Sequence, residues 1–201
     1  MQKVYEYRYN STTESTHKLK DRPHAFFITN IPHGNSLLVP VVSSKRRKYI
    51  PIRFIDEGVI YTNVTNYVDN ATLYDFGILI SNVHMAWMKT FCGRLKLDYR
   101  YSKDLIYNTF PLPNASFEQK QKIEKTAQLI LDVRVKYFNS SLFDLYDEIT
   151  MPPELRKAHQ LNDAAVMEAY SFPVKSTFTE SNCVSELMKL YQEFIDGEEI
   201  I

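Results

Sequence analysis

The sequence predicts an α+β fold: a small, mostly antiparallel β-sheet with one long helix, followed by an α-helical bundle. Three observations support this prediction. Short β-rich runs separated by turn residues occupy the first part of the chain, a capped helical pattern covers residues 73–91, and amphipathic helical patterns follow Pro113. Because the change of pattern coincides with Pro111 and Pro113, we expect two domains, residues 1–113 and 114–201.

Most of the expected strands lie before residue 64. The N-terminal run alternates tyrosines with polar residues, as a strand would, through Val4, Tyr5, Tyr7 and Tyr9. Further β-rich runs cover residues 25–29, 36–42, 49–54 and 59–63. Two of them contain Pro40 and Pro51, which lack an amide donor and are therefore expected at sheet edges or bulges.

Residues 72–101 combine a helix with a charged strand. Thr72 and Asp75 have the spacing of a capping box, and Gly93 lies where the helix is expected to end. Between them, apolar residues recur every three or four positions, at Leu73, Phe76, Ile80, Val83, Trp87 and Phe91. After Gly93, charged residues alternate with Leu and Tyr, at Arg94, Lys96, Asp98 and Arg100. This period of two predicts one strand whose four charged side chains point the same way.

The second half of the chain is expected to be helical. Ser116 and Gln119 form a second capping-box pattern, before a helical repeat through Ile123, Ala127, Ile130, Leu131, Arg134 and Phe138. A short segment at 141–149 precedes Pro152 and Pro153, which suit the first turn of another helix. The apolar positions of that helix are Leu155, Ala158, Leu161, Ala165, Val166 and Ala169. A last helix is expected to begin near Thr179.

Composition argues against catalysis and against a membrane. Only five of the 201 residues are Gly, neither GxGxxG nor GxxxxGK[ST] occurs, and the five His and two Cys have no metal-ligand spacing. No apolar run has the length of a membrane span and the N-terminus has no signal-peptide core, so we expect a cytoplasmic location with a reduced Cys92 and Cys183. His84 is expected to be a hydrogen-bonded packing residue.

Charge is balanced over the chain but uneven along it. Residues 1–112 carry 15 Lys+Arg and 9 Asp+Glu, a net charge of +6, whereas residues 113–201 carry 9 and 15, a net charge of −6. The densest basic run, residues 43–48, consists of Ser43, Ser44, Lys45, Arg46, Arg47 and Lys48. Composition alone leaves two interpretations of this run open, a solvated basic loop and a phosphate-binding loop.

Three long stretches resemble one family of proteins. FGILISNVHMAWMKTFCGRLKLDYRYSKDLIYNTFPLP resembles the target-recognition region of MmeI-like DNA methyltransferases, the single-chain restriction-modification enzymes also called type IIG or type IIL. VPVVSSKRRKYIPIRF resembles the upstream motif of the recognition domain, and SLFDLYDEITMPPELRKAHQLNDAAVMEAY resembles the C-terminal helical domain of that family.

The resemblance implies that this chain is the C-terminal portion of a larger protein. The parent is then an S-adenosylmethionine-dependent adenine-N6 methyltransferase, and it is open whether that protein also cleaves DNA. The portion seen here would itself be non-catalytic and would bind no cofactor. Its expected partners are double-stranded DNA and the methyltransferase domain of the parent.

The resemblance also assigns roles to the charged residues. The positions of Lys96 and Asp98, between the GRL and YRYS motifs, are ones where the family places base-reading side chains. Lys donates to guanine and Asp accepts from the cytosine amino group, so the pair suits one G·C base pair. Phosphate or structural roles are expected for the frame around them, Arg94, Arg100, Ser102 and Lys103. Without the resemblance, Lys96 and Asp98 read as an exposed ion pair worth under about 1 kcal/mol.

A second class of function stays open at this stage. The oppositely charged halves could dock on each other or on a partner protein, leaving no surface for DNA. The chain would then be a non-catalytic interaction or assembly module.

Overall fold

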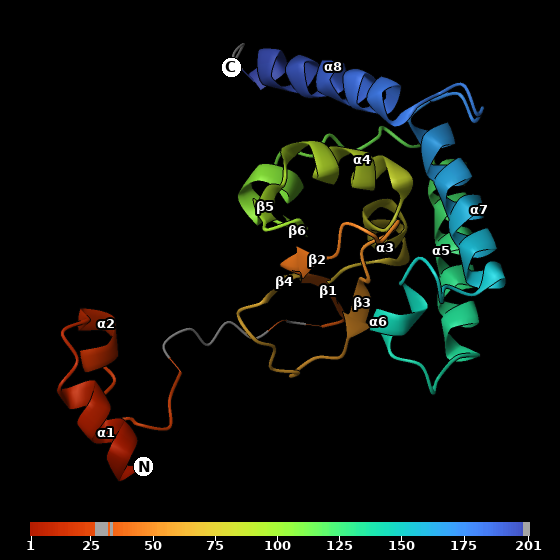
Figure 1. The fold of residues 1–201 in the computed structure, drawn as a ribbon. Helices are drawn as coiled ribbons and strands as arrows, with labels where there is room; N and C mark the ends of the chain where they lie inside the picture. The colour runs from red at the N-terminus through yellow and green to blue at the C-terminus, as the bar shows by residue number, and fades with distance from the viewer. Residues whose placement is uncertain (27–31, 33, 199–201) are drawn as a thin grey trace. The chain divides into compact units, whose positions relative to one another are not determined.

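The structure is a computed structural model that describes residues 1–26, 32 and 34–198 (Figure 1). The chain forms two compact units, Met1–Ile31 and Pro32–Ile201. The second unit contains two small antiparallel sheets and most of the helices, which confirms the predicted α+β class. No helix in the described part of the chain is both long and apolar enough to span a membrane.

The first unit contains helix α1 (Gln2–Tyr9) and helix α2 (Glu14–His17). The predicted N-terminal strand is therefore wrong. Tyr5 and Tyr9 stack one helical turn apart, with ring centroids separated by 5.9 Å. The guanidinium of Arg8 then donates to the carbonyl oxygens of Leu19, Arg22 and Ala25, at 2.7–3.1 Å. No residue of α1 is buried within this unit.

The first sheet of the second unit has the strand order β3-β1-β4, all antiparallel. Its strands are β1 (Ser36–Pro40), β3 (Arg53–Ile55) and β4 (Thr65–Val68). The predicted strand at 36–42 is confirmed as β1 and the start of β2 (Val42–Ser43), and Pro40 stands at the end of β1. The strand predicted at 59–63 is wrong: Ile60 is 73% exposed, and the pairing segment is β4.

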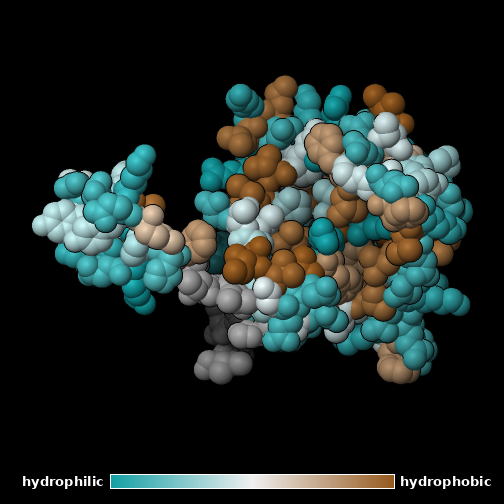
Figure 2. Space-filling view, turned by 90° about the horizontal axis from the view of Figure 1, so that it is seen from below, coloured by the Kyte–Doolittle hydropathy of each residue, from teal (hydrophilic) through white to brown (hydrophobic). Residues whose placement is uncertain are grey.

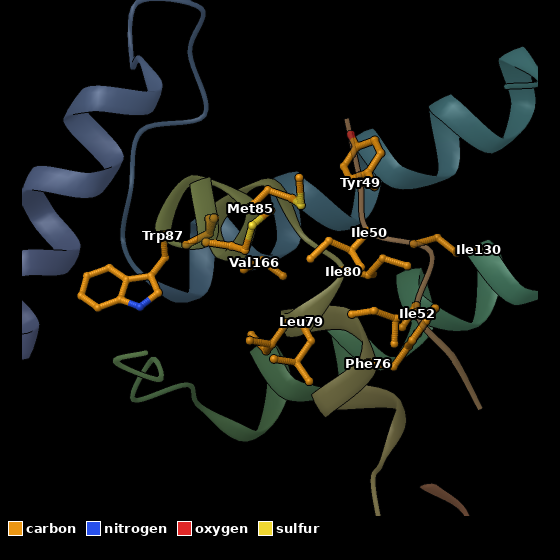
Figure 3. Packing of buried hydrophobic residues seen from close by; sticks show 14 of the residues in the cluster. Tyr49, Ile50, Ile52, Phe76, Leu79, Ile80, Met85, Trp87, Ile130 and Val166 are labelled. Carbon is orange, nitrogen blue, oxygen red and sulfur yellow. The ribbon is translucent and has the colours of Figure 1, made fainter. Parts of the chain in front are cut away.

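Two other predicted strands differ from the structure. Ala25 and Phe26 are not in a strand, and residues 27–29 lie outside the described residues. Only residues 53 and 54 of the run 49–54 pair with β1, as part of β3. Tyr49, Ile50 and Ile52 are instead buried in the core beside the helices (Figure 3). The carbonyl of Ile52 accepts a 2.8 Å hydrogen bond from the Arg134 side chain. Burial on all sides, rather than strand pairing, explains their apolar character.

The predicted helix at 73–91 is two helices, α3 (Leu73–Leu79) and α4 (Asn82–Phe91). The capping box of Thr72 and Asp75 is confirmed. The break occurs because Ser81 caps a new helix: its hydroxyl accepts from the amide of His84 at 3.3 Å and donates to the carbonyl of Ile78 at 2.7 Å. Helix α4 ends at Phe91, and Gly93 begins the next strand.

The helical layer follows the sequence prediction. It consists of α5 (Phe117–Val135), α6 (Leu142–Leu145), α7 (Pro153–Ala169) and α8 (Glu180–Glu198). The Ser116 capping box and the proline start of α7 are confirmed. Two of the positions predicted to be apolar and buried are wrong. Phe138 lies beyond the end of α5 and is 81% exposed. Leu161 is exposed, and the next residue, Asn162, is buried in its place.

Helices α5 and α7 lie side by side and pack on the first half of the second unit (Figure 1). Gly77 of α3 permits a close approach, because a Cβ there would lie 2.5 Å from Cγ2 of Ile123 on α5. The shared core contains Ile50, Ile80 and Val166, with Trp87 at one end (Figure 3). Residues 32–113 and the helical layer therefore bury one continuous core, which fixes the position of the charged segments that flank it.

Candidate nucleic-acid interface

The charged segment after α4 is a β-hairpin. Strands β5 (Gly93–Leu95) and β6 (Asp98–Arg100) pair antiparallel, with Leu95 opposite Asp98, and are joined by a two-residue loop. The prediction of one continuous strand is wrong because both arms of a hairpin keep the same period of two. The loop residue Lys96 has φ = 57°, a conformation unusual for a residue other than Gly.

The hairpin places on different faces the charged side chains that the sequence pattern predicted to share one face. Residues that are directly opposite share a face, so Leu95, Asp98 and Arg100 lie on one face, with Val42 of β2 beside Arg100. This face is open to solvent. Tyr99 and Ser43 point the other way and are buried. The expectation that Arg94 shares the face of Asp98 and Arg100 is wrong: its guanidinium lies 4.3 Å from the centroid of the Tyr99 ring.

Strand β2 brings the basic run 43–48 to the hairpin. Because β2 pairs with β6, the loop that follows Ser43 passes beside Asp98. The backbone amide of Lys45 donates to Oδ1 of Asp98 at 3.3 Å. Lys96 is exposed at the hairpin tip and Asp98 is half-buried. The structure thus brings together both sets of residues singled out from the sequence, the pair Lys96 and Asp98 and the basic run.

The residues of the basic run differ in accessibility. Lys45, Arg46 and Lys48 are exposed and Ser44 is half-buried. Arg46 reaches Asp147 of the helical layer, with Nη2 and Oδ2 separated by 3.4 Å. Arg47 is only 8% exposed and lies over the Phe143 ring, 4.5 Å from its centroid. In this arrangement Ser43 and Arg47 face the protein interior, and the cations of the run that are open to solvent are Lys45, Arg46 and Lys48.

The remaining predicted frame residues follow β6. The hydroxyl of Ser102 accepts from the amide of Leu105 at 3.4 Å and caps a short π-helix, η1 (Lys103–Tyr107). Ser102 therefore has a structural partner, whereas Lys103 is exposed in the first turn. The sequence did not predict this π-helical turn, which ends the hairpin segment.

A buried aromatic cluster supports the hairpin from behind. His84 is fully buried, and its Nε2 lies 3.1 Å from the hydroxyl of Tyr101, directly after β6. Burial lowers the pKa of His84 to about 4, so the imidazole is neutral at pH 7. The predicted packing role of His84 is confirmed. Within the described residues, no group of three or more His, Cys, Asp or Glu is placed to bind a metal ion.

Three residues near this surface were not singled out from the sequence. Phe143 and Asp147 contact the basic run from the helical layer, and no sequence signal connects positions a hundred residues apart. Asp163 is buried and accepts from Tyr49. The sequence did contain a signal for Asp163. Asn162 and Asp163 interrupt the apolar stripe of α7, and polar groups that are buried require hydrogen-bond partners.

Comparison with known proteins agrees with this geometry. Residues 1–114 match the sequence model of the family described as "MmeI, target recognition domain", and residues 115–197 match "MmeI, C-terminal domain". The chain belongs to the MmeI family. Its match to the two MmeI domains in succession accounts for nearly all of its residues.

Two relatives of this MmeI-family chain are informative. DNA methyltransferase A of Bacillus subtilis (strain 168) is 40% identical over 190 residues, which cover 94% of this chain and 21% of that protein. The solved structure of the type IIL restriction-modification enzyme MmeI in complex with DNA has a TM-score of 0.91 and 40% identity, and the match covers 97% of this chain and 26% of that one. The MmeI-family chain described here thus spans about a quarter or less of the length of both relatives.

Proposed function

We propose that this chain is the DNA-reading module of a larger restriction-modification DNA methyltransferase. The observation that carries the proposal is the surface formed by the hairpin tip and the basic run, where Lys96 is exposed and the Lys45 amide donates to Asp98. A β-ribbon of this kind fits the major groove, where base pairs present distinct donors and acceptors. Membership of the MmeI family and the similarity to an enzyme solved with DNA support it.

Within this surface we assign direct base reading to Lys96 and Asp98. The ammonium of Lys96 would donate to guanine O6 and N7, and the carboxylate of Asp98 would accept from the cytosine amino group of the same base pair. Phosphate contacts fall to the exposed cations around them: Lys45, Arg46, Lys48, Arg100 and Lys103. The surface therefore combines sequence-independent attraction with one specific base-pair preference.

We assign methyl transfer to parts of the parent protein outside this chain. The proposed reaction is adenine-N6 methylation with S-adenosylmethionine, in the cytoplasm. A cavity of about 190 Å³ lies between α4 and α8, lined by Lys48, Asn82, Lys89 and Cys183 among others. It is smaller than the roughly 300–1,000 Å³ of small-molecule sites. In this proposal the chain positions the DNA, and the rest of the parent protein performs the chemistry.

The test exchanges the two reading residues. Duplexes with a randomised central region are selected by the wild-type chain and by Lys96→Glu/Asp98→Arg, and the bound fractions are sequenced. We expect the wild type to enrich one G·C position and the double variant to enrich the reversed C·G pair there, because donor and acceptor have changed places. Equal weakening on every sequence, with no change of preferred base pair, would contradict base reading by this pair.

A protein-interaction module is the second candidate function. It is favoured by large apolar side chains that are exposed, and Figure 2 shows apolar residues gathered on one face of the second unit. A mobility-shift experiment with random duplexes at low and moderate salt discriminates the two. Salt-sensitive binding supports DNA reading, whereas absence of binding by the intact parent protein would favour the interaction module.

A further inference from the structure

The carboxylate of Asp98 is oriented by the loop beside it. The Lys45 amide occupies Oδ1, and Oδ2 has no hydrogen-bond partner among the described residues. A base-reading carboxylate is selective only if its free oxygen points in a fixed direction, because the donor pattern of a base edge is read by geometry. The position of the Lys45 amide therefore determines where Asp98 can accept.

The loop that carries Lys45 is anchored by Arg47. The amide of Arg47 donates to the carbonyl of Ser44 at 3.1 Å, which closes a tight turn around Lys45 and Arg46. The Arg47 side chain is buried under the ring of Phe143, which belongs to α6 of the helical layer. Guanidinium groups stack favourably on aromatic faces, so the ring holds one end of the turn.

Electrostatics add to this anchor. Burial lowers the pKa of Arg47, and the negative charges of Asp147 and Asp98 oppose that shift, since both lie close enough to act on the guanidinium. Asp147 also reaches Arg46. The helical layer thus contributes an aromatic ring and a carboxylate to the turn, and these two groups come from a segment about a hundred residues away in the sequence.

We propose that Arg47 and Phe143 are positioning residues for base reading, which hold the turn at 44–47 so that the Lys45 amide fixes the Asp98 carboxylate. This inference rests on the proposed DNA-reading function and gives the helical layer a part in specificity. Arg47 does not act as a phosphate contact here. Its side chain is buried, whereas phosphate contacts need exposed donors.

The test separates positioning from phosphate binding. Phe143→Ala removes the ring, and because Phe143 is 65% exposed, its loss leaves no cavity in the core. Phe138→Ala, at another exposed phenylalanine of the helical layer, is the matched control. Both are compared with the wild type by selection from randomised duplexes, by the salt dependence of duplex affinity, and by hydrogen exchange of the Lys45 amide in the free protein.

We expect Phe143→Ala to lower discrimination at the G·C position roughly fivefold, the lower end of what one side-chain-to-base pairing provides. Its salt slope stays at the wild-type value because no phosphate contact is lost. The Lys45 amide exchanges faster, and Phe138→Ala behaves as the wild type in all three measurements. Arg47→Met, which keeps an apolar stem under the ring, is expected to show the same loss of discrimination.

Two results would overturn this inference and leave the proposed DNA-reading function intact. One is wild-type discrimination in Phe143→Ala together with unchanged exchange of the Lys45 amide. The other is a fall of about 0.9 in the salt slope of Arg47→Met with discrimination kept, which would make Arg47 a phosphate contact. If instead the wild-type chain enriches no base pair, or the Lys96/Asp98 exchange moves none, the proposed function fails and the inference with it.

Discussion

The hydroxyl of Tyr49 donates a 2.7 Å hydrogen bond to Oδ2 of Asp163, which joins the end of the basic run to the helical layer. The backbone amide of Asn82 donates to the other oxygen, Oδ1, at 2.8 Å. Burial nevertheless raises the pKa of Asp163 to about 6, from an ordinary value near 3.9. Two hydrogen bonds therefore do not fully offset the removal of this carboxylate from water.

The raised pKa predicts a pH-dependent effect of Asp163→Asn. Between about pH 4 and 6 the folded state holds the Asp163 proton and the unfolded state has released it, so the contribution of Asp163 to stability falls as pH rises through this window. The neutral amide avoids this loss, and the Tyr49 hydroxyl can turn to accept from it. We expect the variant to gain about 3 kcal/mol relative to the wild type between pH 4 and 7.

The measurement is the free energy of unfolding of both proteins by urea at several pH values. Burial lowers the pKa of His84 and of His159, so these residues raise stability with pH over the same window, but they are present in both proteins and cancel in the difference. A difference between variant and wild type that stays constant with pH would contradict the prediction.

Gly77→Ala tests the contact between α3 and α5. Alanine favours a helix by about 1 kcal/mol over glycine, but its Cβ would lie 2.5 Å from Cγ2 of Ile123. We expect a net loss of stability of about 1–3 kcal/mol, because overpacking outweighs helix propensity. In a double-mutant cycle, Ile123→Ala relieves the contact, so the double variant should lose less than the sum of the two single losses. Additive losses would show that Ile123 is not the obstacle.

Lys96→Gly separates stability from recognition at the hairpin tip. Glycine adopts the positive φ of Lys96 without steric penalty, so we expect the variant to be about 0.5–1 kcal/mol more stable. It should lose the preference for guanine, since the ammonium is gone. Leu97→Gly is the control: the backbone of Leu97 has no positive φ, so glycine there lowers stability. Thermal unfolding and duplex selection measure the two effects, and a Lys96→Gly variant that keeps the preference would exclude base reading by Lys96.

Neutralising the exposed cations of the basic run tests their phosphate contacts. Lys45→Gln and Lys48→Gln are each expected to reduce the slope of log affinity against log salt by about 0.9 and to weaken binding on all sequences alike. Arg53→Gln, an exposed cation in the other sheet, should leave the slope unchanged. Titrations of a random duplex at several salt concentrations give the slopes. An unaltered slope in the lysine variants would remove them from the phosphate contacts.

Local elements with strong chemical signals were predictable from the amino-acid sequence. The capping boxes of Thr72 and Ser116 and the proline start of α7 are encoded within a few residues, because helix ends need local hydrogen-bond partners. The family-like motifs likewise identified the segment around Lys96 and Asp98. What failed were predictions from periodicity alone, such as the strands at 4–9 and 59–63, since alternation does not show whether a partner strand exists.

The distribution of the charged residues depends on the tertiary fold. A hairpin has the same period as one strand, so the separation of Arg94 from Asp98 and Arg100 depended on where the chain turns, at Lys96 and Leu97. The contacts of Arg47 with Phe143, and of Tyr49 with Asp163, join residues about a hundred positions apart. Such contacts form because a shared core brings distant segments together, and a linear pattern carries no record of that distance.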